Sequence, residues 1–415
     1  MNRRILVGLI GLVIIVGVAL LSWQPWRTSN DTSVPAPVAD VARVARIVAN
    51  DTTGNIIVVR EGNPPLALTS DAGASVQYLQ ITPAPDGEQV VYVAVERARS
   101  RLLVQKLDGG APRTVFESSE LRPFYIYWSP DSRQIAFLAS DQTMHLYLVP
   151  ADGSSAAREI REGNPSYFAW TADSTRLILH TGGLAPRGSI ATYTLDGAKL
   201  DVADAAPGNF QAPAWNNDNS ARFVVLSDGT RNRLVRETGA VQQDLSPRTL
   251  DAIIFSRSPD GSQLAYMMLG DTSRSPIQVV AANGGDARAL PPVLPLAFFW
   301  SPDGSRIATL VVEPRGIGPS GAAGVVFVAQ PAPTRLHWEV TTLADNAHQR
   351  FAAFTPSDEF LNLLPYFDQY ALSLDLWSPD SSRLIYGTTD GVQTLHISDG
   401  STTKISDGTQ GFWAK

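Results

Sequence analysis

The chain has 415 residues, of which 40 are acidic and 33 are Lys or Arg, so its net charge is −7 at neutral pH. No cluster of Lys and Arg interrupts this acidic balance, which argues against nucleic acids and anionic lipid surfaces as partners, since both need neutralising positive charge. The sequence contains no cysteine, so the fold uses no disulfide and the redox compartment stays open.

The first 23 residues predict a membrane anchor. Residues 5–23 are apolar and uncharged and follow Arg3 and Arg4. A helix of this length is just long enough to cross a bilayer. By the positive-inside rule, residues 1–4 form a cytoplasmic tail and the rest of the chain is extracytoplasmic. A cleaved signal peptide, with secretion of the remainder, is the alternative. We favour the retained anchor because no small-x-small cleavage site follows the apolar run.

Residues 24–42 are rich in Pro, Ser, Thr and Asp and have no hydrophobic periodicity. This composition predicts a flexible linker.

One phrase then recurs through the chain. "FWSPDGSRIATL" begins at residue 299, "LWSPDSSRLIYG" begins at residue 376, and five looser copies precede them. Ser, Pro and Gly at the first, second and fourth positions of "SPDG" favour a type I turn between two strands. The seven turn aspartates are Asp86, Asp131, Asp173, Asp218, Asp260, Asp303 and Asp380.

Successive turn aspartates are 42 to 45 residues apart, apart from a last gap of 77. This period accommodates four short strands and is typical of a β-propeller blade. After "WSPDSRQIAFLA" come the apolar run "HLYLVP", the turn "ADGS" and a shorter strand. The sequence therefore predicts an all-β propeller of four-stranded antiparallel blades over residues 43–415.

The order of "SPDG", "IAF" and "LYLVPADG" resembles the repeat of TolB-like β-propellers, the bacterial relatives of WD-repeat proteins. The resemblance covers nearly all of the chain after residue 43. It implies a non-enzymatic propeller outside the cytoplasm that binds a protein or peptide of the cell envelope.

The two ends of this region predict how the ring closes. Residues 43–70 supply three strands without a first strand of their own, and the C-terminal "GFWAK" supplies one strand, carrying Phe412 and Trp413, without a blade. We expect these strands to pair, giving seven contiguous blades and one hybrid blade. Seven blades remain the alternative if the N-terminal segment forms no blade.

Two sets of repeated residues have structural explanations. Large side chains at one strand position are typical of packing between blades; they are Trp128, Trp170, Trp215, Trp300 and Trp377. The turn aspartates are explained by turn geometry, because "SPDS" and "SPDG" place no second carboxylate beside them for a metal.

The search for catalytic motifs yields no candidate residue. "GIGPSG" at residues 316–321 lies inside a blade rather than between a strand and a helix, so it predicts a hairpin loop and not a dinucleotide site. No Gly-x-Ser-x-Gly elbow occurs, and the histidines are scattered without metal-site spacing. These are His145, His180, His337, His348 and His396. We expect no catalytic residue, metal or cofactor.

A propeller that uses its central channel to bind a sugar, metal or quinone, or to act as an enzyme, is the second hypothesis. Repeated acids or histidines on the first strands of several blades would favour it. Those strands read "YLQI", "FYIY", "YFAW", "AIIF" and "LAFFW", which favours the binding scaffold.

The long last gap contains an insertion at 346–374. Thr355 as N-cap and Pro356 at the first helical position predict a short helix, ended or kinked by Pro365 and followed by an aromatic-rich return strand. Loops on a rigid scaffold often contain the binding residues of a protein. The apolar and aromatic side chains of this insertion must be covered either by the ring or by a partner. The candidate partner-binding residues are Phe360, Leu364, Tyr366, Phe367 and Tyr370. A plug packed over the channel mouth is the alternative.

Overall fold

The computed structural model describes residues 45–163, 166–182, 188–202, 206–208, 211, 213–216, 218–270, 274–291, 294–313 and 334–415. The predicted tail, anchor and linker, and the "GIGPSG" loop, lie outside these residues.

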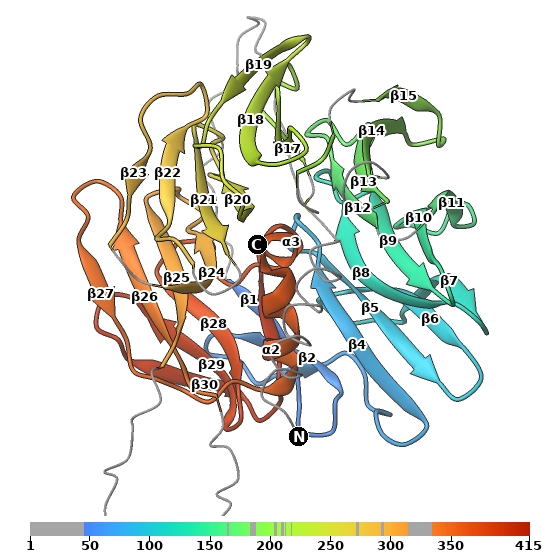
Figure 1. Cartoon of the computed structure of the whole chain (residues 1–415). Coiled ribbons are helices and arrows are strands. Elements are labelled where there is room, and N and C mark those ends of the chain that lie inside the picture. The colour runs from blue at the N-terminus through green and yellow to red at the C-terminus, as the bar shows by residue number, and fades with distance from the viewer. Residues whose placement is uncertain are drawn as a thin grey trace, which may run out of the picture.

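Eight antiparallel sheets surround a central axis as propeller blades (Figure 1). The hybrid blade has the order β3-β2-β1-β31, with β1 Arg46–Asn50, β2 Ile56–Arg60, β3 Leu66–Ala67 and β31 Gly411–Ala414. The next three are β4 Val76–Pro83, β5 Gln89–Glu96, β6 Ser100–Lys106 and β7 Arg113–Ser118; β8 Arg122–Trp128, β9 Gln134–Ser140, β10 Met144–Pro150 and β11 Arg158–Glu162; and β12 Ser166–Trp170, β13 Arg176–Thr181, β14 Ser189–Thr194 and β15 Lys199–Val202.

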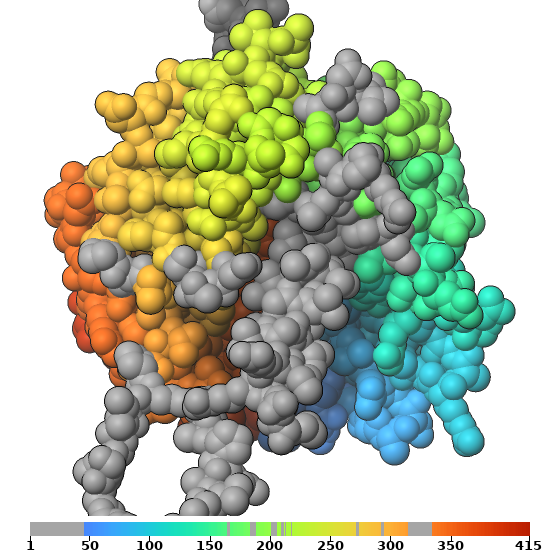
Figure 2. Space-filling view, in the orientation of Figure 1, coloured from blue at the N-terminus to red at the C-terminus, as the bar shows by residue number. Residues whose placement is uncertain are grey.

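The remaining blades follow the same meander. They are β16 Ala214–Trp215, β17 Arg222–Ser227, β18 Asn232–Thr238 and β19 Val241–Asp244; β20 Ala252–Arg257, β21 Gln263–Leu269, β22 Gln278–Ala281 and β23 Arg288–Ala289; β24 Pro295–Trp300, β25 Arg306–Val312, β26 Leu336–Thr342 and β27 His348–Arg350; and β28 Arg383–Thr388, β29 Gly391–His396 and β30 Thr402–Ser406. In Figure 2 the blades lie side by side around the ring in chain order. The prediction of eight blades is confirmed, and the alternative of seven is wrong.

The last blade departs from four full strands. Its first strand is reduced to a bridge between Trp377 and Leu384, supported by a hydrogen bond from Ile385 N to Leu376 O of 2.8 Å. The insertion enters the chain immediately before this point, which explains why so little of the strand remains.

Pairing of the two ends closes the ring. β31 runs antiparallel to β1, with Ala49 opposite Gly411 and Arg46 opposite Ala414. The Asn50 side chain holds the turn before β31, because its Oδ1 accepts hydrogen bonds from Thr409 N and Gln410 N, both at 2.9 Å. The predicted hybrid blade is confirmed.

Four of the repeated tryptophans join neighbouring blades. The indole N–H of Trp128 donates to Thr82 O at 3.0 Å, and that of Trp170 to Tyr127 O at 3.2 Å, each on the first strand of the preceding blade. Trp300 and Trp377 make the equivalent contacts at 3.3 and 3.2 Å. These contacts support packing between blades as the role of the repeated position.

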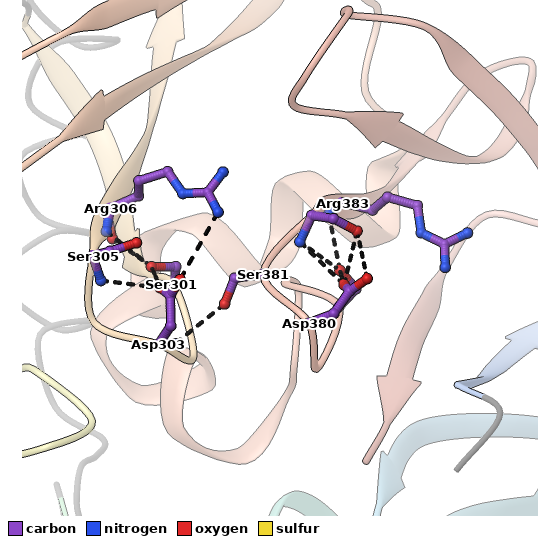
Figure 3. Close-up of polar contacts among 9 residues, drawn as sticks. Ser301, Asp303, Ser305, Arg306, Asp380, Ser381 and Arg383 are labelled. Atoms are coloured by element: carbon purple, nitrogen blue, oxygen red, sulfur yellow. Dashed lines mark hydrogen bonds and ion pairs between the residues drawn. The ribbon is translucent and has the colours of Figure 1, made fainter. Parts of the chain in front are cut away.

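Every turn aspartate organises its own turn. Each carboxylate accepts a hydrogen bond from the backbone N–H two residues later, as Ser305 N donates to Asp303 at 3.0 Å (Figure 3). Burial alone would raise the pKa of Asp303, but hydrogen bonds from Ser301 and Ser305 and the nearby charge of Arg306 hold it below its usual value. These hydrogen bonds stabilise the turns between the first and second strands.

The residue after the turn aspartate is glycine in some copies and serine in others. This position has positive φ, near +69° at Gly87, Gly261 and Gly304 and near +59° at Ser132 and Ser174. Serine there carries a strain that glycine avoids. In three copies its hydroxyl accepts a hydrogen bond of 3.1 Å from the aspartate N–H of the preceding blade. Figure 3 shows one such link, from Asp303 to Ser381.

The insertion is helical from residue 358 to residue 373. It comprises α2 Asp358–Leu363, the 3₁₀ turn η1 Leu364–Tyr366 and α3 Phe367–Ser373. The predicted N-cap was wrong: Ser357 caps α2 by accepting a hydrogen bond from Phe360 N at 3.2 Å. Thr355 and Pro356 are instead extended beside the last blade, where Thr389 N donates to Thr355 O and Pro356 bridges to Thr388.

The predicted return strand was also wrong, because its place is taken by α3. Pro365 was expected to end or kink the helix. α2 ends at Leu363, two residues before Pro365, and the chain continues into η1, where Pro365 lies near the start and a missing N–H costs little. Residues 348–350 form β27, so the extra chain begins at residue 351 and not at 346.

Candidate functional site

The helices of the insertion lie inside the ring (Figure 1). α3 contacts β8, β20 and β24, which belong to three different blades, and α2 contacts β28. The Phe367 ring packs edge-on against Phe298 and Phe299 of β24, with centroid distances of 5.2 and 5.9 Å. The chain thus fills part of its own central channel with apolar side chains.

The five predicted partner-binding residues fall into two groups. Phe360, Leu364 and Phe367 are 3 to 4% exposed and belong to the core. Tyr366 and Tyr370 are half-buried. Tyr370 packs against two core clusters, so Tyr366 is the member of the set best placed to contact another molecule.

Two irregularities in the inner strands shape the channel around α3. Gln80 in β4 and Tyr125 in β8 have φ of 55° and 38° and lie at interruptions of the strand register. Bulges of this kind redirect side chains and are frequent near functional sites. Gln80 Oε1 accepts a hydrogen bond from Tyr125 N at 3.2 Å, and the Tyr125 ring lies 5.4 Å from that of Tyr370. The irregular positions therefore meet the insertion directly.

A cavity of about 310 Å³ lies beside α3. Phe255 and Arg257 of β20 and Phe299 and Trp300 of β24 line it, and Asp368 of α3 lies on the opposing element. Arg257 occupies the position that carries tryptophan in most other repeats. This volume falls within the range of small-ligand sites. We define these residues and their neighbours as the channel cavity.

Burial shifts the pKa values of two charged groups of the channel cavity, Asp368 and Arg257. It raises the pKa of Asp368 to about 7, and backbone N–H groups at the start of α3 offset this only in part. It lowers the pKa of Arg257 to about 10, against the opposing charges of Tyr127 and Asp260. Among the described residues, no cation forms an ion pair with Asp368.

The raised pKa predicts a pH-dependent effect of Asp368→Asn. The folded state holds the proton more tightly than the unfolded state, whose reference pKa is 3.8. The resulting stabilisation is complete below that value and is lost as the pH rises towards 7. Asparagine stays neutral at every pH. The unfolding free energy of the variant, relative to that of the wild type, should therefore rise by roughly 3 kcal/mol when the pH is raised from about 5 to about 8. Urea melts of both proteins measure this, and a difference that does not change with pH would contradict it.

A second polar cluster was missed from the sequence. On β26, the buried His337 lies with Nδ1 2.9 Å from Glu313 and Nε2 2.8 Å from Glu339. His348 of β27 lies 2.7 Å from the other oxygen of Glu339. The signal was present in "HWEV", since residues two apart share one face of a strand. In the part of the chain that the structure describes, no group of three His, Cys, Asp or Glu is placed to hold a metal ion.

The channel cavity itself could not be read from the motifs. Arg257 is an exception to the repeated tryptophan and Asp368 is an acid within an aromatic segment, but neither feature by itself indicates a cavity. Their proximity depends on α3 turning into the channel, which the predicted return strand would not have done.

In the described residues, no helix combines the length and the apolar character that crossing a membrane needs. The predicted anchor precedes this part of the chain.

Comparisons with known proteins find structural neighbours only. No family model matches the sequence, and no curated protein matches it. A eukaryotic initiation factor is 13% identical, with 90% of this chain and 99% of that chain covered and a TM-score of 0.54. An oligogalacturonate lyase in complex with manganese is 14% identical, with 82% and 92% covered and a TM-score of 0.51.

TolB from Acinetobacter baumannii is also among the neighbours, at 17% identity. The match covers 58% of this chain and 61% of the TolB chain, with a TM-score of 0.37, so no argument rests on it. The neighbours include an enzyme and proteins of other kinds, and a shared propeller does not fix a function. Together, the comparisons and the eight blades show that this chain has the β-propeller fold.

Proposed function

We propose that this chain is a membrane-tethered β-propeller that binds a protein or peptide of the cell envelope outside the cytoplasm, and that it is not an enzyme. The observation that carries the proposal is the occupation of the channel by α2 and α3. Propellers that act on substrates in an open channel need that space, whereas a filled ring offers its rim and loops to a partner.

The exposed side of the insertion is the proposed contact surface. Glu359, Asn362 and Pro365 are exposed and Tyr366 is half-buried, while the opposite side of the same segment packs on the ring. Tyrosine beside polar residues is a common composition for binding hot spots. The tether rests on the uncharged stretch at 5–23 and the two arginines before it.

Capture of a partner tests the proposal. The full chain should carry its tag at the N-terminus, because the C-terminal strand lies within the hybrid blade. A partner cross-linked in envelope extract should be captured by the wild type and lost with Tyr366→Ala, which should leave the melt within about 0.5 kcal/mol. The control is Leu250→Ser. Leu250 lies outside the insertion and is 78% exposed, so this variant tests whether capture depends on non-specific adhesion to an exposed apolar side chain. Equal capture by both variants would contradict the proposed surface.

The tether has its own test. Protease added to intact cells without an outer barrier should release the propeller by cutting within 24–42. Full protection of the propeller would contradict the proposed side of the membrane. A mature N-terminus near residue 24 would show cleavage in place of a retained anchor.

A further inference from the structure

The channel cavity has the features of a small-molecule site that is separate from the proposed partner surface. Its walls are Phe255, Phe299 and Trp300, and its floor is α3 with Asp368 and Leu372. The two phenylalanines are 4 and 5% exposed, so the ring holds their positions. A cavity of about 310 Å³ accommodates a ligand of amino-acid size.

Asp368 gives the cavity its chemistry. The side chain is nine-tenths buried, and it lines the cavity without a cationic partner among the described residues. A buried carboxylate is costly unless it is paired. An ammonium group in the cavity would supply the missing charge, and the faces of aromatic rings attract cations as well. The net charge of −7 favours a cationic ligand further.

The cations already near the cavity are accounted for by other groups. Lys415 Nζ lies 3.0 Å from Asp375 at the rim, and the charge of Arg257 interacts with Tyr127 and Asp260. Neither neutralises Asp368. Arg257 would repel an ammonium group placed beside it, so the ammonium group belongs at the Asp368 end, and a carboxylate on the same ligand would be drawn to Arg257.

We propose that the channel cavity binds a small organic ammonium compound, with its charged nitrogen at the Asp368 carboxylate and its apolar part against Phe255, Phe299 and Trp300. A simple alkylamine and an amino acid share this chemistry. The first uses Asp368 and the aromatic walls, and the second uses Arg257 in addition.

Binding should depend on pH in a defined direction. The Asp368 pKa of about 7 means that the carboxyl is mostly protonated at about pH 6 and mostly ionised at about pH 8. The ammonium group requires the ionised form, so affinity should be about tenfold weaker at the lower pH, and binding there should release a proton. The amine keeps its own charge over this range. Arg257, Asp375 and Lys415 line the same cavity, and Tyr125 and Tyr167 also interact electrostatically with Asp368.

Titration calorimetry on the full chain in detergent tests the proposal, with n-butylamine, leucine and isovalerate as probes. The amine should bind at millimolar concentration and isovalerate should not. Leucine binding more tightly than the amine would identify the amino-acid source, and the reverse order would identify the alkylamine. Asp368→Asn should weaken binding at least about tenfold at pH 8. Asp286→Asn removes an exposed charge between β22 and β23, outside both the cavity and the proposed contact surface, and should change nothing.

Three results would overturn the proposal: no binding of either ammonium probe, unchanged binding in a folded Asp368→Asn variant, or equal binding of isovalerate. Failure of the small-molecule site can be distinguished from failure of the proposed partner binding, because partner capture is measured on the same variants. Loss of amine binding with capture intact would show that the two surfaces are independent.

Discussion

Deletion of residues 411–415 should unfold the propeller or lower its melting temperature sharply. The deletion removes β31, which pairs with β1 over four residues, and the side chains of Phe412 and Trp413, which are 2 and 1% exposed. Loss of a buried aromatic side chain costs about 3 to 5 kcal/mol. Two such losses are comparable to the whole stability of a typical domain, about 5 to 15 kcal/mol.

Further contacts of β31 are lost in the same deletion. Trp413 N donates to Asp375 O at 3.0 Å, and the Arg383 guanidinium lies 4.9 Å from the Trp413 ring. The hybrid blade therefore loses its connection to the last blade as well as its innermost strand. Lys415→Ala, which changes only the exposed terminal side chain, is the control for thermal melts. A melt of the truncated chain equal to that of the control would show that the ends do not close the ring.

Phe367→Ala should cost about 3 to 5 kcal/mol of unfolding free energy. The ring is 3% exposed and fills the space between α3 and the inner strand β24. Its removal leaves a cavity between the insertion and the ring, which a packed interior closes only in part. Denaturant titration measures the loss.

Asn362→Ala provides the matched control, because Asn362 is exposed in the same segment and its truncation should stay within about 0.5 kcal/mol. If both variants melted alike, the insertion would contribute little to the folded ring.

The repeat allowed most of the fold to be predicted. The spacing of the turn aspartates predicted four strands per blade. The strands left over at the two ends predicted the hybrid blade, with Phe412 and Trp413 in its inner strand. These features rest on local turn chemistry and strand periodicity, which a single sequence carries.

The insertion was harder to predict because tertiary contacts decide it. Thr355 and Pro356 fit a helix start, but hydrogen bonds to the last blade keep them extended, and Ser357 becomes the cap. Leu364, Phe367 and Leu374 are buried at intervals of three and seven residues, which is a helical spacing. The aromatic residues after Pro365 favoured the prediction of a strand and so obscured this helical spacing.

The channel cavity was beyond prediction for a different reason. The positive φ angles at Gln80 and Tyr125 arise where inner strands meet α3, and nothing local requires them. Asp368 becomes unusual only through burial by several blades, which no motif encodes.

Thiol labelling tests most directly whether the insertion fills the channel, and the absence of cysteine from the chain gives a clean background. Leu364→Cys places a thiol at a position that is 4% exposed, and Asn362→Cys places one on the exposed side two residues earlier. In the native protein, the thiol at 364 should react with a bulky maleimide at least about a hundredfold more slowly than that at 362, because reaction requires local opening. Equal rates, in chains that melt like the wild type, would contradict a channel filled by α2 and α3.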